Sequence, residues 1–295
     1  MQPSAEASWH PGEPVPNSSG TARPQTPVPP GACDAHIHII DPRFSMPVPI
    51  AMPGMTFDDY RAHQARLGTE RFVAVQAKLH GTNHDALVNA LERSGGQGRG
   101  IAVVHPDVSD AELRRLDGAG VRGLRFSLWK ASDTVTTIDM VAPLARRVAD
   151  LGWHAQLHMA ADQIVAARGL LDNLPCPIVF DHMGRLPPRE GPNHPAFAVI
   201  RALLDRGRTW VKLSGGYLNT EIGPPDYPDA SRMAQAFVAA APDRLVWGSD
   251  WPHVTETHKP DDARLLDLLA EWCPDRVKRD RILVGYAAEL YGFAV

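Results

Sequence analysis

Cysteine is scarce in this chain. Only three of its 295 residues are cysteines, Cys33, Cys176 and Cys273, and they stand far apart with no Cys-x-x-Cys pair. An odd, sparse count does not fit a disulfide scaffold and is typical of reduced, buried thiols. We therefore expect a protein of a reducing compartment, the cytoplasm.

Long apolar runs and clusters of positive charge are also missing. No run approaches the length that spans a bilayer, and residues 1–30, rich in Pro, Ser, Gly and Thr, have one basic residue, Arg23, and no apolar core of a signal peptide. The net charge is −4 with no Lys/Arg-rich run, which argues against nucleic acid. We expect a small-molecule substrate, no membrane or nucleic-acid partner, and an assembly that could be a homo-oligomer.

Short apolar runs alternate with helical patterns from Ala32 onward. The eight predicted strands are Cys33–Ile40, Arg71–Lys78, Gly100–Val104, Val121–Ser127, Trp153–His158, Pro177–His182, Thr209–Ser214 and Leu245–Ser249. Helical periods cover Ala86–Ser94, Met140–Leu151, Ala161–Leu171, Ala196–Arg206, Ser231–Ala241 and Asp261–Trp272. Capping sequences predict further helices after Thr56 and Ser109. This alternation predicts an α/β fold, a single-domain (β/α)8 TIM barrel over residues 31–295, preceded by a flexible, Pro-rich arm over residues 1–30.

A doubly wound open sheet is the alternative architecture. It would require a Gly-rich phosphate-binding turn after the first strand. This chain has Asp34-Ala35-His36-Ile37-His38 there, so the barrel is the preferred prediction.

Histidine and aspartate gather at the predicted carboxyl ends of the strands. His36 and His38 alternate onto one face of the first strand, although such a pair taken alone is weak evidence for a site. Later strands end in His158, His182 and Asp250. TIM barrels place their chemistry at this end, and buried imidazoles and carboxylates need partners. The set as a whole therefore predicts an active site.

Two chemistries fit this set. His36, His38, His158 and Asp250 offer the ligands of one divalent metal ion, such as Zn²⁺ or Mn²⁺, with a position left for water. Without a metal, Asp250 would take a proton from water while the histidines polarise a carbonyl oxygen. His182 would contact the substrate or an oxyanion in either case. The cofactor is thus predicted to be either none or one divalent ion.

From about Ala32 to Phe293 the chain resembles the amidohydrolase superfamily, and specifically the amidohydrolase-2 branch with 2-pyrone-4,6-dicarboxylate lactonase and related TIM-barrel lactonases. The resemblance is carried by Asp34-Ala35-His36-Ile37-His38, His80-Gly81-Thr82-Asn83, Arg122-Gly123-Leu124-Arg125-Phe126, Gln156-Leu157-His158, Asp181-His182-Met183-Gly184, Val211-Lys212-Leu213-Ser214-Gly215, Trp247-Gly248-Ser249-Asp250-Trp251-Pro252-His253 and Ala288-Glu289-Leu290-Tyr291-Gly292-Phe293.

The resemblance implies roles for individual residues. His36, His38 and His158 would ligate a metal or polarise a lactone carbonyl, Asp250 would be the general base, and His182 would be a neighbouring contact. Arg125 would anchor a substrate carboxylate, for which a forked guanidinium is suited, and His80 would bind substrate. The family member acting on the pyrone dicarboxylate works without a metal, so these residues alone do not imply a bound ion.

The chain departs from the family pattern at several positions. The fourth strand has no Lys or Glu to bridge two metals, which argues against a binuclear centre. Leu218 and Ala131 stand where dicarboxylate lactonases tend to carry arginines. Lys78 and Lys130 could instead supply point charges for the substrate, and His253, in the loop after the last strand, could reach it.

We therefore expect a hydrolase that opens a lactone, a cyclic ester of a carboxylated substrate, by attack of water activated by Asp250. Two alternatives stay open: a metal-dependent decarboxylase of an aromatic or enol acid, and a lactone isomerase. The same proton-moving groups would serve each reaction.

Overall fold

The structure is a computed structural model that describes residues 9–47, 53–130 and 135–294. Its eight strands form one sheet in which each strand pairs in parallel with the next along the chain. They are β1 (Cys33–Ile37), β2 (Arg71–Val75), β3 (Gly98–Ala102), β4 (Val121–Ser127), β5 (His154–His158), β6 (Ile178–Phe180), β7 (Thr209–Leu213) and β8 (Leu245–Trp247).

The sheet closes between its first and last strands. The backbone N–H of Asp250 donates to the carbonyl of His36 and that of His38 donates to the carbonyl of Trp251, both at 2.8 Å. A parallel bridge between Ile37 and Trp251 lies at the same place. The predicted (β/α)8 barrel is confirmed.

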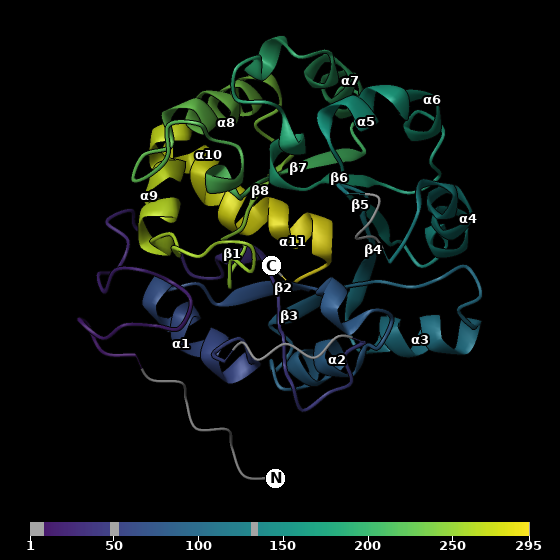
Figure 1. The fold of residues 1–295 in the computed structure, drawn as a ribbon, viewed down its shortest axis with the longest axis horizontal. Helices are drawn as coiled ribbons and strands as arrows, with labels where there is room; N and C mark the ends of the chain where they lie inside the picture. Colours follow the sequence, from purple (N-terminus) through teal and green to yellow (C-terminus); the bar gives the residue numbers. More distant parts are fainter. Residues whose placement is uncertain (1–8, 48–52, 131–134, 295) are drawn as a thin grey trace.

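The helices surround the barrel (Figure 1). They are α1 (Phe57–Leu67), α2 (Asp85–Glu92), α3 (Asp110–Gly118), α4 (Ile138–Ala149), α5 (Ala161–Ala166), α6 (Arg168–Leu171), α7 (Pro195–Leu204), α8 (Pro228–Ala240), α9 (Asp262–Trp272), α10 (Arg276–Asp280) and α11 (Tyr286–Tyr291). Thr56 and Ser109 cap α1 and α3 as predicted. The predicted helix Ala161–Leu171 is instead two helices, because Ala167 leaves helical geometry between α5 and α6.

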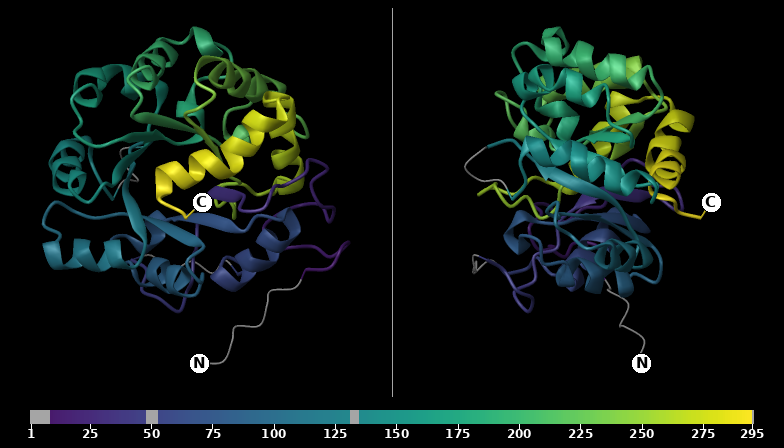
Figure 2. Two further views of the ribbon diagram at one scale, coloured as in Figure 1. Left: turned by 180° about the vertical axis from the view of Figure 1, so that it is seen from behind. Right: turned by 90° about the vertical axis from the view of Figure 1, so that its right-hand side faces the viewer.

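The two ends of the barrel differ. Figure 2 (right) shows the C-terminal helices on one side of the barrel and the loops that follow the strands on the other. Tyr291 of α11 is fully buried against the ring of His154 at 5.6 Å, and its carbonyl accepts from Arg99 at 3.2 Å. The amino-terminal end is thus closed, and the carboxyl end is left open for a site.

Residues 9–30 lie along α1 and α9. Arg66 of α1 donates to the carbonyls of Ala22 and Ser19 at 2.9 Å each, and the indole of Trp251 donates to Pro16 at 2.8 Å. The backbone N–H of Thr26 donates to Asp267 of α9 at 2.7 Å. In the part of the chain that the structure describes, no helix is long and apolar enough to cross a membrane.

Candidate active site

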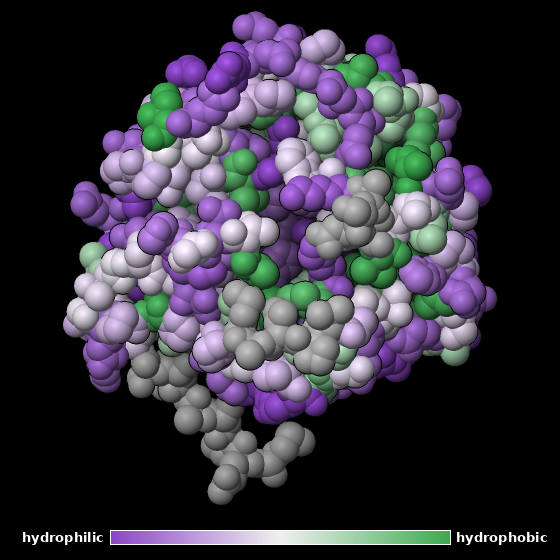
Figure 3. Space-filling view, viewed as in Figure 1, coloured by the Kyte–Doolittle hydropathy of each residue, from purple (hydrophilic) through white to green (hydrophobic). Residues whose placement is uncertain are grey.

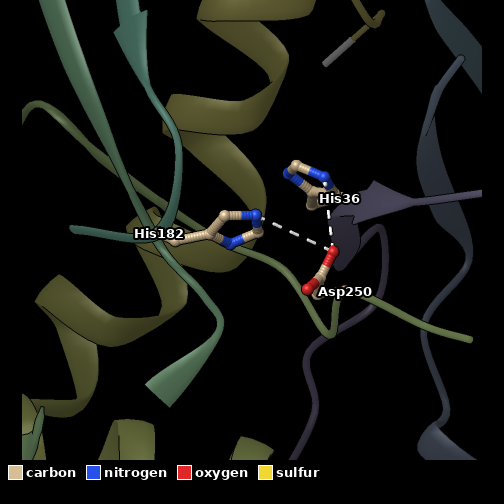
Figure 4. Close-up of side chains that lie close together, drawn as sticks. All are labelled: His36, His182 and Asp250. Atoms are coloured by element: carbon tan, nitrogen blue, oxygen red, sulfur yellow. Dashed lines mark ion pairs between the residues drawn. The ribbon is translucent and has the colours of Figure 1, made fainter. Parts of the chain in front are cut away.

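The predicted residues of β1 and β8 meet at the open end of the barrel. Nε2 of His36 and Nε2 of His38 lie 3.3 Å apart. The Oδ1 atom of Asp250 lies 3.5 Å from the first and 3.4 Å from the second. Nε2 of His182 is 3.9 Å from the same oxygen. Figure 4 shows His36 and His182 pointing at Asp250 from different elements.

The outer nitrogens of the β1 histidines are also occupied. Nδ1 of His38 lies 2.7 Å from the carbonyl of Val75, so this nitrogen carries a proton and donates it. Nδ1 of His36 lies 3.3 Å from Asp181 and 3.4 Å from Nζ of Lys212, both completely buried. Burial, and next the charge of Lys212, hold the pKa of His36 well below its ordinary value, so His36 is neutral at neutral pH.

Asp250 is fixed by its backbone and by a phenol. Its φ of 66° is a left-handed conformation that non-glycine residues rarely adopt. Tyr217 donates to its Oδ2 at 2.6 Å, which leaves Oδ1 to face the histidines. Burial opposes ionisation of Asp250, but the surrounding imidazoles, His182 foremost, hold its pKa well below the ordinary value. Asp250 is thus a carboxylate at neutral pH.

His182 and His158 form the adjoining wall. His182 begins the 3₁₀ turn η3 (His182–Arg185) after β6, and its Nδ1 lies 2.9 Å from the hydroxyl of Ser214. Burial lowers the pKa of His182 to about 4. The ring of His158 lies 5.3 Å from that of His182 and stacks on Trp129 at 5.9 Å. The Nε2 atom of His158 is buried without a hydrogen-bond partner.

These donors fit a metal ion. His36, His182 and Asp250 each present one ligand atom, and the three atoms lie within 4.8 Å of one another. Because His38 donates through Nδ1, its Nε2 carries a lone pair when the ring is neutral, and this nitrogen faces the Asp250 carboxylate. Facing acceptors require a cation between them, whether a proton or a metal. The predicted ligand His158 lies against His182 and is not part of this three-residue group.

A cavity of about 420 Å³ opens above this cluster and is lined by cations. Figure 3 shows this face of the molecule hollowed near its centre, with hydrophilic residues around the hollow. Lys78, Arg125, Lys130 and Arg185 line the cavity, and among the described residues Glu256 is the acidic lining residue besides Asp250. Burial, and then the charges of Arg125 and Lys130, lower the pKa of Lys78. Crowded positive charges in a cavity favour an anionic ligand.

The predicted substrate-binding residues divide into two groups. Arg125, Lys78 and Lys130 line the cavity. His80 lies outside the cavity lining, where its Nδ1 faces the carbonyl of Ser45 at 3.1 Å. His253 also lies outside the cavity lining. Its Nδ1 faces the hydroxyl of Tyr217 and its Nε2 faces the carboxylate of Asp262.

Sequence reasoning did not single out four residues of the site. Arg185 and Tyr217 line the cavity, and Lys212 and Asp181 lie below it against His36. Lys212 stands in the middle of an apolar strand, which is itself a signal because lysine is seldom buried without a partner. Arg185 and Tyr217 lie in loops, where no periodicity marks them.

Comparisons with known proteins find relatives along most of the chain. Over 274 residues the chain is 35% identical to a 4-sulfomuconolactone hydrolase of Rhizobium radiobacter, covering 90% of this chain and 91% of that one. Over 283 residues it is 34% identical to a 2-pyrone-4,6-dicarboxylate hydrolase of Comamonas testosteroni, covering 92% and 93%.

Solved structures share the fold. One from Acinetobacter baumannii, described as a probable 2-pyrone-4,6-dicarboxylic acid hydrolase with citric acid bound, superposes with a TM-score of 0.77 at 25% identity, covering 89% of this chain and 100% of that one. The family model for amidohydrolases of the amidohydrolase-2 type matches residues 33–293. The chain therefore belongs to the amidohydrolase family whose sequence pattern runs from β1 to the end of the C-terminal helices.

Proposed function

We propose that this protein hydrolyses a lactone that carries anionic substituents, with Asp250 as the general base. The observation that carries the proposal is the position of Asp250 Oδ1, which lies 3.4–3.9 Å from three histidine Nε2 atoms at the floor of a cationic cavity. The similarity to hydrolases of a sulfonated lactone and of a pyrone dicarboxylate supports the same reaction class.

The chemistry uses one water molecule. Oδ1 of Asp250 takes a proton from the water, whose oxygen then bonds to the lactone carbonyl carbon. Negative charge develops on the carbonyl oxygen in the tetrahedral intermediate, and His36 and His182, whose Nδ1 atoms can accept from Lys212 and Ser214, would donate to it from Nε2–H. As the intermediate collapses, the ring carbon–oxygen bond breaks and the departing oxygen takes the proton from Asp250. The product is an open-chain hydroxy acid, or its keto form where the departing oxygen is an enol.

We also propose that the cluster binds one divalent ion, Zn²⁺ or Mn²⁺. Its residues would be His36, His38 and Asp250 with His182 alongside, since their acceptor atoms converge. Such an ion would polarise the carbonyl or lower the pKa of water. Asp250 keeps the same task of holding the proton in either case.

The cavity lining supports an anionic substrate. Arg125 is buried, donates to the carbonyl of Gln76 at 3.2 Å and reaches Asp181 only at 4.0 Å. Its Nε is buried without a hydrogen-bond partner, and so is that of Arg185. Two guanidinium groups with open hydrogen-bonding capacity suit carboxylate or sulfonate oxygens.

The proposal is tested by turnover of neutral, monoanionic and dianionic lactones in H₂¹⁸O. Hydrolysis at the carbonyl places one ¹⁸O atom in the new carboxylate. Isomerisation without ¹⁸O uptake, or release of CO₂, would assign the site to an isomerase or a decarboxylase instead.

A further inference from the structure

A chain of hydrogen bonds leads from Asp250 away from the cavity. Tyr217, in the 3₁₀ turn η5 (Gly216–Leu218), donates its hydroxyl proton to Oδ2 of Asp250 at 2.6 Å. Nδ1 of His253 lies 2.9 Å from the same hydroxyl oxygen. Nε2 of His253 lies 3.0 Å from both carboxylate oxygens of Asp262, the first residue of α9. Four residues from two loops and the start of one helix are therefore connected in series.

His253 and Asp262, the two residues of this series farthest from the cavity, cannot contact a substrate. His253 is 1% exposed and Asp262 is 0% exposed, and neither lines the cavity. Burying an imidazole and a carboxylate is costly unless they are paired. Here they are paired with each other, and the remaining ring nitrogen is aimed at the phenol that holds the general base.

The hydrogen bonds have one consistent direction. A hydroxyl has a single proton, so Tyr217, which donates to Asp250, must accept from Nδ1–H of His253. This direction requires a proton on both ring nitrogens of His253, and Nε2–H then donates to the carboxylate of Asp262. Burial, and next the charge of Asp250, raise the pKa of Tyr217 well above its ordinary value, so it stays a phenol and a donor.

Other parts of the fold hold the Asp262 end of this hydrogen-bond series in place. The backbone N–H of Asp262 donates to the hydroxyl of Ser18 at 3.3 Å, and Ser18 itself accepts from Arg66 of α1 at 3.1 Å. The backbone N–H of His253 donates to the carbonyl of Asp250 at 3.0 Å, which closes the turn between them. The hydrogen-bond series is therefore fixed at both ends. Ser18, in the segment before β1, contributes at the Asp262 end.

We propose that Tyr217, held by the His253–Asp262 pair, is a positioning residue that ties up Oδ2 of Asp250 and thereby presents Oδ1 to the reacting water. This inference rests on the proposed function, because it assigns Asp250 the role of base. A carboxylate free to rotate would divide its time between two orientations, and only one of them faces the three imidazoles. Supporting groups of this kind typically change activity by about 10- to 100-fold.

A double-mutant cycle tests the proposal. Tyr217→Phe, Asp262→Asn and the double variant are compared for kcat and KM on a lactone that the wild type turns over. We expect Tyr217→Phe to lower kcat by about 10-fold or more with KM within about threefold. Asp262→Asn should lower kcat in the wild-type background and have little further effect once the Tyr217 hydroxyl is gone, because the coupling passes through that hydroxyl.

The controls separate positioning from folding. Asp261→Asn alters the neighbouring residue, which pairs with Arg66 rather than with His253, and Tyr60→Phe removes a buried hydroxyl from α1. Both should leave kcat unchanged, and thermal unfolding of every variant reports stability. If Asp262→Asn proves too unstable to assay, the kcat and KM of Tyr217→Phe alone test the positioning role of the Tyr217 hydroxyl.

Wild-type kcat in Tyr217→Phe would overturn the inference, and so would an Asp262→Asn effect of equal size with and without the Tyr217 hydroxyl. A rise in KM alone would make Tyr217 a substrate-binding group and overturn it too. Failure of the underlying function is distinguishable, because in that case Asp250→Asn would itself retain activity.

Discussion

Nε2 of His36 lies 3.3 Å from Nε2 of His38, a hydrogen-bond distance that requires a proton or a metal ion between the two nitrogens. Both nitrogens also face Oδ1 of Asp250. The outer nitrogen of His38 is committed to the carbonyl of Val75, so the inner one has no proton of its own when the ring is neutral. The three atoms therefore converge on one point that a proton or a metal ion must occupy.

We predict that a divalent metal ion binds at this point. The purified protein loaded with Zn²⁺ or Mn²⁺ should contain about one ion per chain, as measured by elemental analysis. Removing the ion with a chelator should lower both activity and the unfolding temperature, since an ion at 100 times its Kd stabilises by about 2.7 kcal/mol. His38→Ala should lose the ion, whereas His258→Ala, at an exposed loop position, should keep it. Full activity and an unchanged unfolding temperature in metal-free protein would contradict this prediction.

Arg185 should recognise an anionic group of the substrate. Its guanidinium stacks over Trp129 at 4.0 Å and donates to the carbonyl of Leu218 at 3.2 Å. Charge-assisted hydrogen bonds contribute about 1.5–3 kcal/mol, so Arg185→Gln should raise KM for a dianionic lactone by roughly 10- to 100-fold. Arg189→Gln removes a surface guanidinium paired with Glu221 and should have no effect. An unchanged KM in Arg185→Gln would remove this residue from the binding site.

The loop at Gly215 should be intolerant of a side chain. Its φ is +61°, and a Cβ there would meet Nδ1 of His182 at 2.8 Å. Gly215→Ala should therefore displace His182, lower kcat, and reduce the free energy of unfolding by about 1–3 kcal/mol. Gly216→Ala is the matched control, because its Cβ would meet only Ala230 at an ordinary 3.8 Å. Urea unfolding and kcat measure both effects, and equal behaviour of the two variants would refute the role of Gly215.

The barrel itself could be predicted from sequence because apolar strand runs repeat eight times. The strand ends could not. The sequence pattern predicts β6 from Pro177 to His182, but the strand ends at Phe180, and His182 and Met183 have φ values of 49° and 55°. The backbone leaves strand geometry where it positions a side chain toward the site. The strand propensities of the residues do not indicate where this happens.

The residue types of the proposed catalytic set could be predicted from the sequence, but the hydrogen bonds that connect them to other residues could not. His36, His38, His182 and Asp250 share a strand-end position, so topology alone brings them together. The contact of Tyr217 with Asp250 joins residues 33 positions apart in two loops, and no spacing rule marks such a pair. The same holds for Arg185, which places a guanidinium in the cavity although the family arginine positions hold Leu218 and Ala131.

The central claim is that Asp250 activates water for attack on a lactone carbonyl, and Asp250→Asn tests it most directly. The amide keeps the size of the side chain but cannot accept the proton. Single-turnover assays in H₂¹⁸O, with folding checked by circular dichroism and thermal unfolding, should show a folded protein with at least a roughly 100-fold loss of ¹⁸O incorporation into the ring-opened acid. A folded Asp250→Asn protein that opens the lactone at a rate near that of the wild type would contradict the account.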